Sequence, residues 1–479
     1  MRIRKFCHAG GARSGEAEVK KQKRGTAVKV DQGSKLSVIQ SDVAGIDIGS
    51  REMFVCGPAD QQGRREMRVF ATTTEQIQQC VGWLKQQKVR SVAMESTGVY
   101  WIPVLEIMES SGVEVLLVDT RPLSRVPGRK TDAEDCQWLQ TLHSHGLLRG
   151  AYRPSEQISE LRTIVRQKAV LVRQQADWIR RLHKCLDQMN VRIHHAVTDT
   201  KGATGMAMLR AIVNGERDPR NLAKLRDPGC QKSEAEMVEL LTGNWRSDHV
   251  FNLKQHMAMY DSAVRQIAVY EEEIQRRMRE ITPAGRRDLP APPLAKLEKR
   301  KTMKKRDQEG KRQALYRAMG VDLTTIDGIG VETVEVILSE YGTEVSKFQT
   351  EGEFVKHVGL APQRPVSGGK VLKNKRKKQM GTRTAEVLRN AASSLKHSRS
   401  ALGAYYRRIA HRKDSGIAVF AAARKLAEHF YRMLRYGQEY VDVGQTAYDK
   451  RYEETRIRAL KSTAKQMGYS LVKQEAISA

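Results

Sequence analysis

The stretch VAGIDIGSREMFVCG, residues 43–57, decides the fold of the N-terminal part of the chain. It contains two short runs with strand-like composition, at 43–48 and 52–57, and a third run, REMRVFA, follows at 65–71. Short runs that include β-branched and aromatic residues and are separated by polar breaks are typical of strands. The sequence therefore predicts three adjacent strands where the folded region begins.

Downstream of these strands, helical and strand-like segments alternate. TEQIQQCVGWLKQ (74–86) has apolar residues at helical spacing, and further helices are predicted from Tyr100 and over 131–145. SVAMES (91–96) and VEVLLVD (113–119) are predicted to be strands. The order β-β-β-α-β-α-β-α predicts an α/β domain in which a mixed sheet carries helices on its faces.

Two later segments, within 155–193 and 253–281, follow a heptad pattern. Their apolar residues alternate spacings of three and four, which is typical of a coiled-coil seam. The seam is expected at Leu161, Val165, Lys168, Val172, Gln175, Ile179, Leu182, Leu186, Met189 and Ile193, and then at Leu253, Met257, Tyr260, Val264, Ile267, Ile274, Met278 and Ile281. Two long helices separated by a connector with Gly and Pro predict a long antiparallel coiled coil.

These patterns divide the chain into six parts. They are a basic disordered arm (1–40), an α/β domain (41–150), a coiled-coil arm with an inserted connector (151–283), a basic linker (284–317), a mainly α C-terminal domain (318–438) and a helical tail (439–479).

The charge of the chain indicates its partners. The 479 residues include 84 Lys and Arg against 55 Asp and Glu, a formal net charge of +29. An excess of this size predicts a polyanionic partner, most simply nucleic acid. A basic membrane-surface protein is the alternative, but no lipidation motif or apolar run long enough for a membrane span supports it. The six scattered cysteines suggest a reducing cytosol, with neither disulfide framework nor structural zinc.

Four carboxylates stand at positions where an α/β sheet forms sites. Asp47 lies at the end of the first predicted strand and Glu95 at the end of the fourth, while Asp132 and Asp135 share one face of the helix in KTDAEDCQW. Converging acids repel one another unless cations neutralise them, so hard oxygen ligands beside a phosphate substrate predict Mg²⁺ or Mn²⁺. Two alternatives remain at this point: a helix cap for Asp132, and an actin-like kinase phosphate loop at Asp47.

A single serine introduces a second candidate group. APQRPVSGGKVLKNKRKKQ (361–379) places Ser367 before Gly368 and Gly369. A dense basic run follows, at Lys370, Lys373, Lys375, Arg376, Lys377 and Lys378. Serine is a weak nucleophile that needs a base or a metal-polarised phosphate, and no histidine adjoins it in sequence. From the residues alone, a Ser-Gly turn in a solvated basic loop is the favoured interpretation.

Two further patterns indicate binding surfaces. TTIDGIGVETVEVILSEYG (324–342) predicts a helix, a Gly-Ile-Gly hairpin at Gly328 and Gly330, and a second helix, whose backbone N–H groups can hold a DNA phosphate. Arg166, Arg173 and Arg180 recur every seven residues along the first coiled-coil helix, with few paired acids. We interpret this stripe as an RNA-backbone contact; plain structural alternatives are a helix–helix turn and a solvated helix face.

The motifs GIDIGS, MESTGVYW and GRKTDAEDCQWL, in this order, resemble those of the DEDD-type insertion-sequence transposases. These are the bridge-RNA-guided recombinases of the family numbered one-hundred-and-ten, and the likeness is to its eleven-eleven subgroup. LHSHGLLRGAYRP and GLAPQRPVSGGK extend the likeness, which covers about residues 40 to 470. Cys136 departs from the pattern, because alanine is common after the last aspartate, and the N-terminal arm is longer than usual.

The resemblance implies a RuvC-like (RNase H-like) N-terminal domain, a coiled coil and a C-terminal transposase domain. It implies that Asp47, Glu95, Asp132 and Asp135 are the metal-binding tetrad and that Ser367 is the nucleophile. The implied partners are an element-encoded guide RNA, donor DNA and target DNA, with dimers that pair into a tetramer in the bacterial cytoplasm, on the nucleoid when active.

The function predicted from the sequence is therefore RNA-guided DNA recombination through a covalent phosphoserine. Two alternatives stay open: a RuvC-like nuclease in which the metal activates water, and a non-catalytic nucleic-acid-binding scaffold. A covalent protein–DNA adduct separates the first from the second, and the third predicts no cleavage at all.

Overall fold

The computed structural model describes residues 37–96, 98–118, 132–293, 304–362, 366–367, 370–371 and 382–472. The predicted N-terminal arm lies almost wholly outside these residues. The chain divides into two compact units, Met1–Arg153 and Pro154–Ala479, and each is described by itself. The six-part division made from the sequence is finer than this and stays a prediction.

The first unit is built on one five-stranded sheet with the order β3-β2-β1-β4-β5. The strands are β1 (Val43–Ile48), β2 (Glu52–Ala59), β3 (Arg65–Ala71), β4 (Ser91–Glu95) and β5 (Glu114–Val118). The first three pair antiparallel, whereas β4 pairs parallel to both β1 and β5. The predicted mixed sheet is thereby confirmed.

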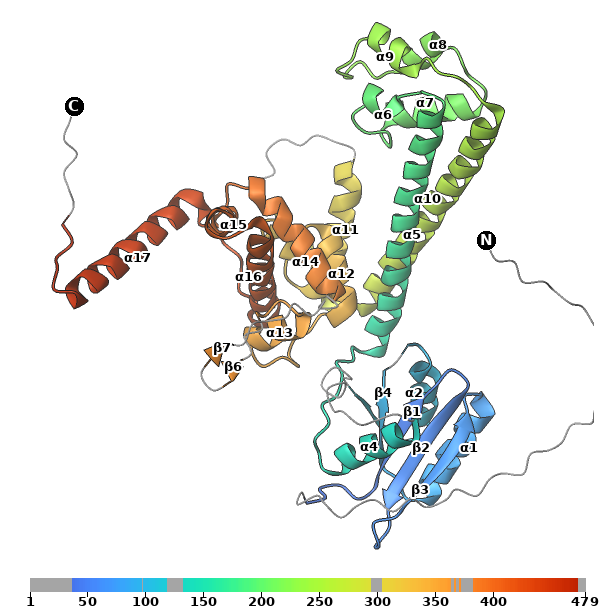
Figure 1. Ribbon diagram of the computed structural model, residues 1–479, viewed down its shortest axis with the longest axis vertical. Coiled ribbons are helices and arrows are strands. Elements are labelled where there is room, and N and C mark those ends of the chain that lie inside the picture. The colour runs from blue at the N-terminus through green and yellow to red at the C-terminus, as the bar shows by residue number, and fades with distance from the viewer. Residues whose placement is uncertain are drawn as a thin grey trace, which may run out of the picture. The chain divides into compact units, whose positions relative to one another are not determined.

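Helices cover both faces of this sheet. Helices α1 (Thr74–Gln86) and α2 (Trp101–Ser110) share a core cluster with strand residues such as Ile46. Helix α4 (Asp132–Ser144) packs on β1 and β2 at the opposite face (Figure 1). Since side chains alternate along a strand, Ile46 faces α1 and α2 and its neighbour Asp47 faces α4.

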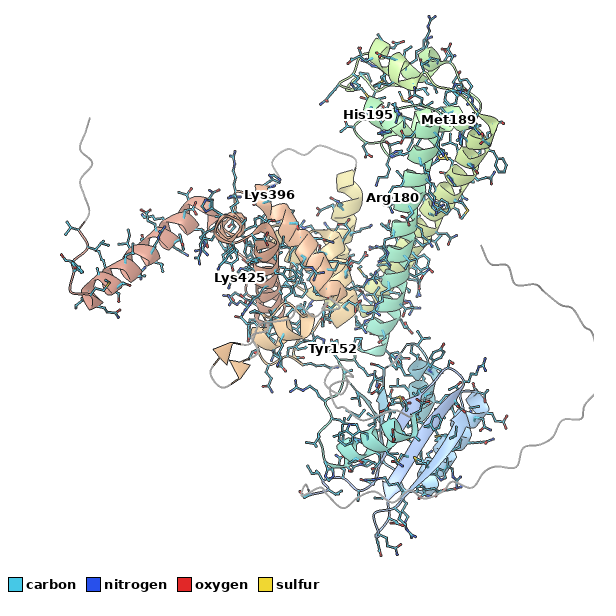
Figure 2. All side chains as sticks on the ribbon, in the orientation of Figure 1. Tyr152, Arg180, Met189, His195, Lys396 and Lys425 are labelled. Carbon is cyan, nitrogen blue, oxygen red and sulfur yellow. The ribbon has the colours of Figure 1, made fainter. Side chains whose placement is uncertain are left out.

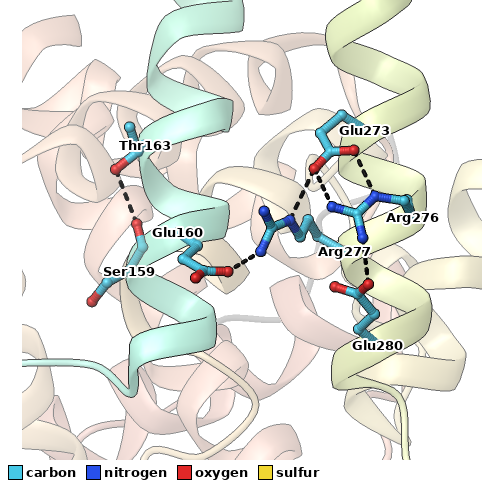
Figure 3. A network of polar contacts seen from close by, with 7 residues as sticks. All are labelled: Ser159, Glu160, Thr163, Glu273, Arg276, Arg277 and Glu280. Carbon is cyan, nitrogen blue, oxygen red and sulfur yellow. Dashed lines mark hydrogen bonds and ion pairs between the residues drawn. The ribbon is translucent and has the colours of Figure 1, made fainter.

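Two long helices begin the second unit. Helix α5 (Glu156–Gln188) and helix α10 (Ser247–Ile281) pack along each other, and a helical cap lies at one end of the pair (Figure 1). The cap comprises α6 (Ile193–Ala196), α7 (Ala203–Val213), α8 (Pro219–Ala223) and α9 (Glu234–Leu241). At the other end, Arg277 of α10 pairs with Glu160 of α5 (Figure 3).

The predicted heptad seam is buried at both ends of the helix pair but not in the middle. Leu161, Leu182 and Leu253 are fully buried, as are most of the other seam residues. Val172 is 44% exposed and Val264 is 38% exposed, so the seam prediction is wrong at these two positions. Ala263 is buried beside Val264, because a helix of 3.6 residues per turn drifts against a strict heptad.

The rest of the second unit is mainly helical, as predicted. It contains α11 (Lys304–Met319), α12 (Val331–Tyr341), α13 (Glu351–Val358), the two-residue strands β6 (Val366–Ser367) and β7 (Lys370–Val371), α14 (Arg383–Ser394), α15 (Ala401–Arg412), α16 (Ser415–Tyr436) and α17 (Gly444–Gln466), with one-turn 3-10 helices at Ala284–Arg286, Leu323–Thr325 and Leu395–His397. Phe354, Phe430 and Tyr431 pack in its core, and the Tyr431 hydroxyl donates to the Phe348 carbonyl at 2.8 Å.

Two predictions in this region differ from the structure. The first helix expected in 324–342 is only the 3-10 turn Leu323–Thr325, because the Asp322 side chain accepts from the Thr324 N–H and starts a tight turn instead. Within the predicted linker 284–317, α11 is helical and its Arg312 side chain is buried against Asp322. No helix in the described part of the chain is both long enough and apolar enough to cross a membrane.

Candidate active site

The four predicted carboxylates come from three separate segments of the first unit. The parallel register pairs Ile46 with Met94, so that Asp47 on β1 and Glu95 on β4 follow side by side at the carboxyl ends of neighbouring strands. Both lie on the sheet face that α4 covers, by strand alternation. Asp132 and Asp135 stand in the first turn of α4.

Electrostatics show that these groups are close to one another. The pKa of Asp47 is raised from 3.8 to about 6. Burial is the largest cause, and the charges of Asp132, Glu95 and Asp135 follow in that order, against a smaller opposing effect of the Ile48 N–H. The charges of the other three carboxylates thus act on Asp47, at a site where the negative charges oppose each other.

Gly45 explains how α4 comes so close to the strand that carries Asp47. A Cβ atom at this position would lie 2.2 Å from the Cys136 carbonyl oxygen and 2.4 Å from the Gln140 backbone nitrogen. Only a residue without a side chain lets the α4 backbone rest on β1 here. Gly45 lies two residues before Asp47, so the same contact sets the position of Asp135, the residue before Cys136.

The floor beneath the carboxylates contains sulfur, which the sequence reasoning missed except for noting Cys136. The Cys136 thiol donates to the Ala133 carbonyl at 3.2 Å and lies 3.9 Å from the Met67 sulfur. Cys56 is paired with Gly45 across the sheet and is fully buried, as is Cys136. Its hydrogen bond with Cys56 and its burial raise the pKa of the Cys136 thiol, whereas the same hydrogen bond lowers the pKa of the Cys56 thiol.

The donor set suits a hard divalent cation, since carboxylate oxygens are the ligands that Mg²⁺ and Mn²⁺ prefer. The pKa of Asp47 is raised first by burial and then by repulsion from its neighbours, and a bound cation would oppose both effects. As placed, no three His, Cys, Asp or Glu side chains within the described ranges are close enough to hold one ion together. Thr97 and residues 119–131, which flank Glu95 and Asp132 in sequence, lie outside those ranges.

Ser367 lies in the second unit, on a small hairpin. Its strand β6 pairs antiparallel with β7, with Val366 opposite Val371 and Ser367 opposite Lys370. The base of the segment is fixed, because the Thr382 hydroxyl donates to the Val358 carbonyl at 2.6 Å. Of the predicted basic run, Lys373, Lys375, Arg376, Lys377 and Lys378 lie outside the described residues, and only the backbone is described at Lys370.

The Gly-Ile-Gly segment packs against α14. Gly328 has φ +88°, and a Cβ there would lie 3.1 Å from the Ala391 carbonyl oxygen and 3.1 Å from the Leu395 side chain. Gly330 is the N-cap residue of α12. The backbone conformation and the close neighbours therefore already require a glycine at Gly328. Its presence is explained without a phosphate, and the predicted phosphate contact stays a hypothesis.

The arginine stripe has more ion-pair partners than predicted. Arg166 donates two hydrogen bonds to the Glu340 carboxylate, at 2.9 and 2.7 Å. Arg180, nearer the cap end of α5 in Figure 2, pairs with Asp177. The expectation of few paired acids is wrong at these two positions: Glu340 comes from α12, 174 residues along the chain, and Asp177 stands on α5 itself. For Arg173, no ion pair is found within the described residues.

Two family models match the chain. One, the DEDD transposase domain of the IS110 type, is described as a transposase and matches residues 44–191. The other, described as transposase IS116/IS110/IS902 family, matches residues 320–407. The first range contains all four carboxylates, and the second contains Gly328, Gly330, Ser367 and the basic run. No curated protein matches the chain.

Proposed function

The chain belongs to the IS110 family of transposases, and from this premise we propose that it is an RNA-guided recombinase that excises and inserts its own mobile element through a phosphoserine. The transposase activity follows from the family. The guide RNA, the serine chemistry, the RuvC-like assignment and the assembly are the proposal.

The observation that carries the proposal is that Asp47 and Glu95 lie on neighbouring strands, that Asp132 and Asp135 lie on the helix packed against β1, and that the charges of all three others act on Asp47. Asp47, Glu95, Asp132 and Asp135 would hold Mg²⁺, or Mn²⁺, through their oxygens. When bound, such an ion polarises a phosphodiester and stabilises the charge that develops on its oxygens.

Ser367 would supply the nucleophile. Its hydroxyl oxygen attacks the phosphorus of the DNA strand and the bond to the leaving deoxyribose oxygen breaks, so that the serine proton passes to that oxygen or to solvent. A free hydroxyl of another strand then attacks the phosphoserine and releases the serine. Because one phosphodiester is exchanged for another, strand rejoining needs no nucleotide cofactor.

The two halves of this site lie in different compact units. We therefore include in the proposal that one protomer's carboxylates act with a partner's serine, in dimers that pair into a tetramer. Helices α5 and α10 would form an antiparallel coiled coil, which the buried residues at both ends of their contact support. The guide RNA and the donor and target DNA are the polyanions that the net charge of +29 accommodates.

The test uses end-labelled donor DNA, the co-purified RNA and Mg²⁺, followed by a denaturing gel. The wild-type chain is expected to give a slowly migrating covalent adduct that disappears on protease treatment. Ser367→Ala is expected to bind the DNA but to give neither adduct nor cleavage. Ser462→Ala, in exposed helix α17, is the matched control and is expected to behave as the wild type.

The outcomes separate the alternatives. Cleavage that persists in Ser367→Ala without an adduct would identify a nuclease that uses water. A lack of cleavage by the wild-type chain with RNA, both DNA partners and either metal would favour the binding scaffold.

A further inference from the structure

The junction between helices α5, α12 and α14 carries a cluster of arginines around one carboxylate. Glu340, near the end of α12, has a side chain that is only 11% exposed. It accepts the two hydrogen bonds of Arg166 and lies 3.3 Å from the Arg162 guanidinium, so both arginines of α5 converge on it. Next to them, Lys168 and Glu335 form a buried ion pair that is neutral as a whole.

Two more guanidinium groups belong to the same cluster. Arg173 lies two helical turns beyond Arg166 on α5, and Arg383 is the first residue of α14, which packs against α12. Burial lowers the pKa of Arg383; the charges of Arg166 and Arg173 lower it further, while Glu340 opposes them. Arg166 and Arg173 are therefore both near enough to Arg383 for their charges to repel it.

The positive charge of this cluster is not balanced within it. Glu340 is paired with Arg162 and Arg166, and the charges of Glu340 and Glu386 act on Arg383. No ion pair is found for Arg173 or Arg383 within the described residues. A partly buried positive charge such as that of Arg383 is costly without a counter-charge, so the arrangement is suited to an anion that arrives from outside.

The shape of the cluster favours a polymer backbone. Glu340 lies at the buried end, whereas the Arg166 side chain is 51% exposed even while paired, and Arg173 is exposed. Planar guanidinium groups can each hold a phosphate by two hydrogen bonds. Arg166 and Arg173 are seven residues apart, about 10 Å along a helix, a span that takes more than one phosphate.

The position of the cluster relates it to Ser367. Arg383 directly follows Thr382, whose bond to Val358 closes the base of the segment that carries Ser367. We propose that Arg166, Arg173 and Arg383, positioned by Glu340, form a phosphodiester-binding site that holds nucleic-acid backbone beside this segment. The link to strand cleavage rests on the proposed function, but the binding site does not.

The test measures binding alone, in the Ser367→Ala chain with a chelator, so that no cleavage is needed. Fluorescence anisotropy with a labelled DNA duplex and, separately, with a labelled copy of the co-purified RNA gives affinity against KCl concentration. Arg383→Gln and Arg173→Gln are each expected to weaken binding about five- to ten-fold and to reduce the salt slope by about one. Arg220→Gln, on α8 in the cap at the far end of the helix pair, is the matched control and should change neither.

The two probes identify the source of the phosphates. A loss with DNA, with RNA or with both supports the site and names its ligand. Unchanged affinity and slope with both probes in both variants would overturn the proposal, as would an equal loss in Arg220→Gln. Should Arg383→Gln lower the melting temperature, the exposed Arg173 still decides the result. If the wild-type chain gave no covalent adduct, the proposed serine chemistry would be contradicted. The binding measurements would still decide whether the phosphodiester-binding site exists.

Discussion

The carboxylate cluster and the serine segment are held in opposite ways. Asp47 and Glu95 end neighbouring strands of a five-stranded sheet, and α4 is pressed onto that sheet at Gly45. Ser367 lies in a two-residue strand between α13 and α14. The carboxylates of the proposed site are therefore positioned by the core of their unit. The position of Ser367 depends instead on the two ends of a connecting segment.

The largest effect is expected from the carboxylates. Asp47→Asn, Glu95→Gln or Asp135→Asn should each lower DNA cleavage at least about 10³-fold, because each removes a ligand of a shared ion that stabilises the transition state. RNA binding should stay near the wild-type level. Glu114→Gln, an exposed acid at the start of β5, should retain activity. Near-wild-type cleavage by any of the three variants, or by the wild-type chain in excess chelator, would contradict the proposal that these carboxylates bind a catalytic metal ion.

The second effect tests whether the two halves meet across protomers. Asp47→Asn and Ser367→Ala chains are each expected to be inactive, and co-expression should restore part of the cleavage. Random pairing would leave on the order of a quarter of composite sites intact. Two differently tagged copies of Asp47→Asn, co-expressed, are the control. Mixed tetramers that form, as shown by tandem affinity purification, and still do not cleave would mean that each chain closes its own site.

The third effect concerns the contact that positions the charged half. Gly45→Ala should lower the free energy of unfolding by about 3 kcal/mol, because the new methyl group collides with the α4 backbone. Gly82→Ala is the matched control: it lies on exposed helix α1 with open space around it, and should stabilise the chain by about 0.5–1 kcal/mol. Urea unfolding of both variants is the measurement. Equal stability of the two would show that α4 does not rest on β1 as described.

The smallest effect is a pH dependence in the metal-free protein. Asp47 has a pKa of about 6 in the folded chain against an ordinary value of 3.8, so between these values the unfolded chain has lost a proton that the folded chain keeps. Stability should therefore fall as pH rises through this window, by about 1–2 kcal/mol once solvent screening is allowed for. Asp47→Asn should melt higher than the wild type at pH 7 in EDTA, but not at pH 3.5. An equal difference at both pH values would contradict the raised pKa.

Much of the first unit could be predicted from the sequence, because strand and helix periods are local properties. The strands at 43–48 and 65–71 and the helix at 74–86 begin and end where the pattern indicates. The placement of Asp47 and Glu95 followed from their positions at the ends of buried strands. The transposase family, inferred from short motifs, is confirmed by the two family models.

What could not be predicted depends on contacts between distant segments. Nothing local indicates that Gly45 lies under Cys136, or that Arg166 meets Glu340 across 174 residues. The stripe prediction missed both Glu340, on another helix, and Asp177, on the same helix. Val172 was assigned to the seam by its spacing alone, while its exposure depends on how α5 and α10 diverge from a strict heptad.

The start of the serine segment at Val358, where the Thr382 hydroxyl is bound, also limits how far Ser367 can lie from α13. Ser367 is nine residues from Val358 along the chain, and nine residues span at most about 30 Å when fully extended. Whatever position the serine segment takes on a bound nucleic acid, the Ser367 hydroxyl therefore stays within about 30 Å of the end of α13. At about 3.4 Å per base pair, the attacked phosphate must lie within roughly nine base pairs of the point where the duplex passes α13. The attachment of the serine segment at Val358 thus limits how far the cleavage position can vary.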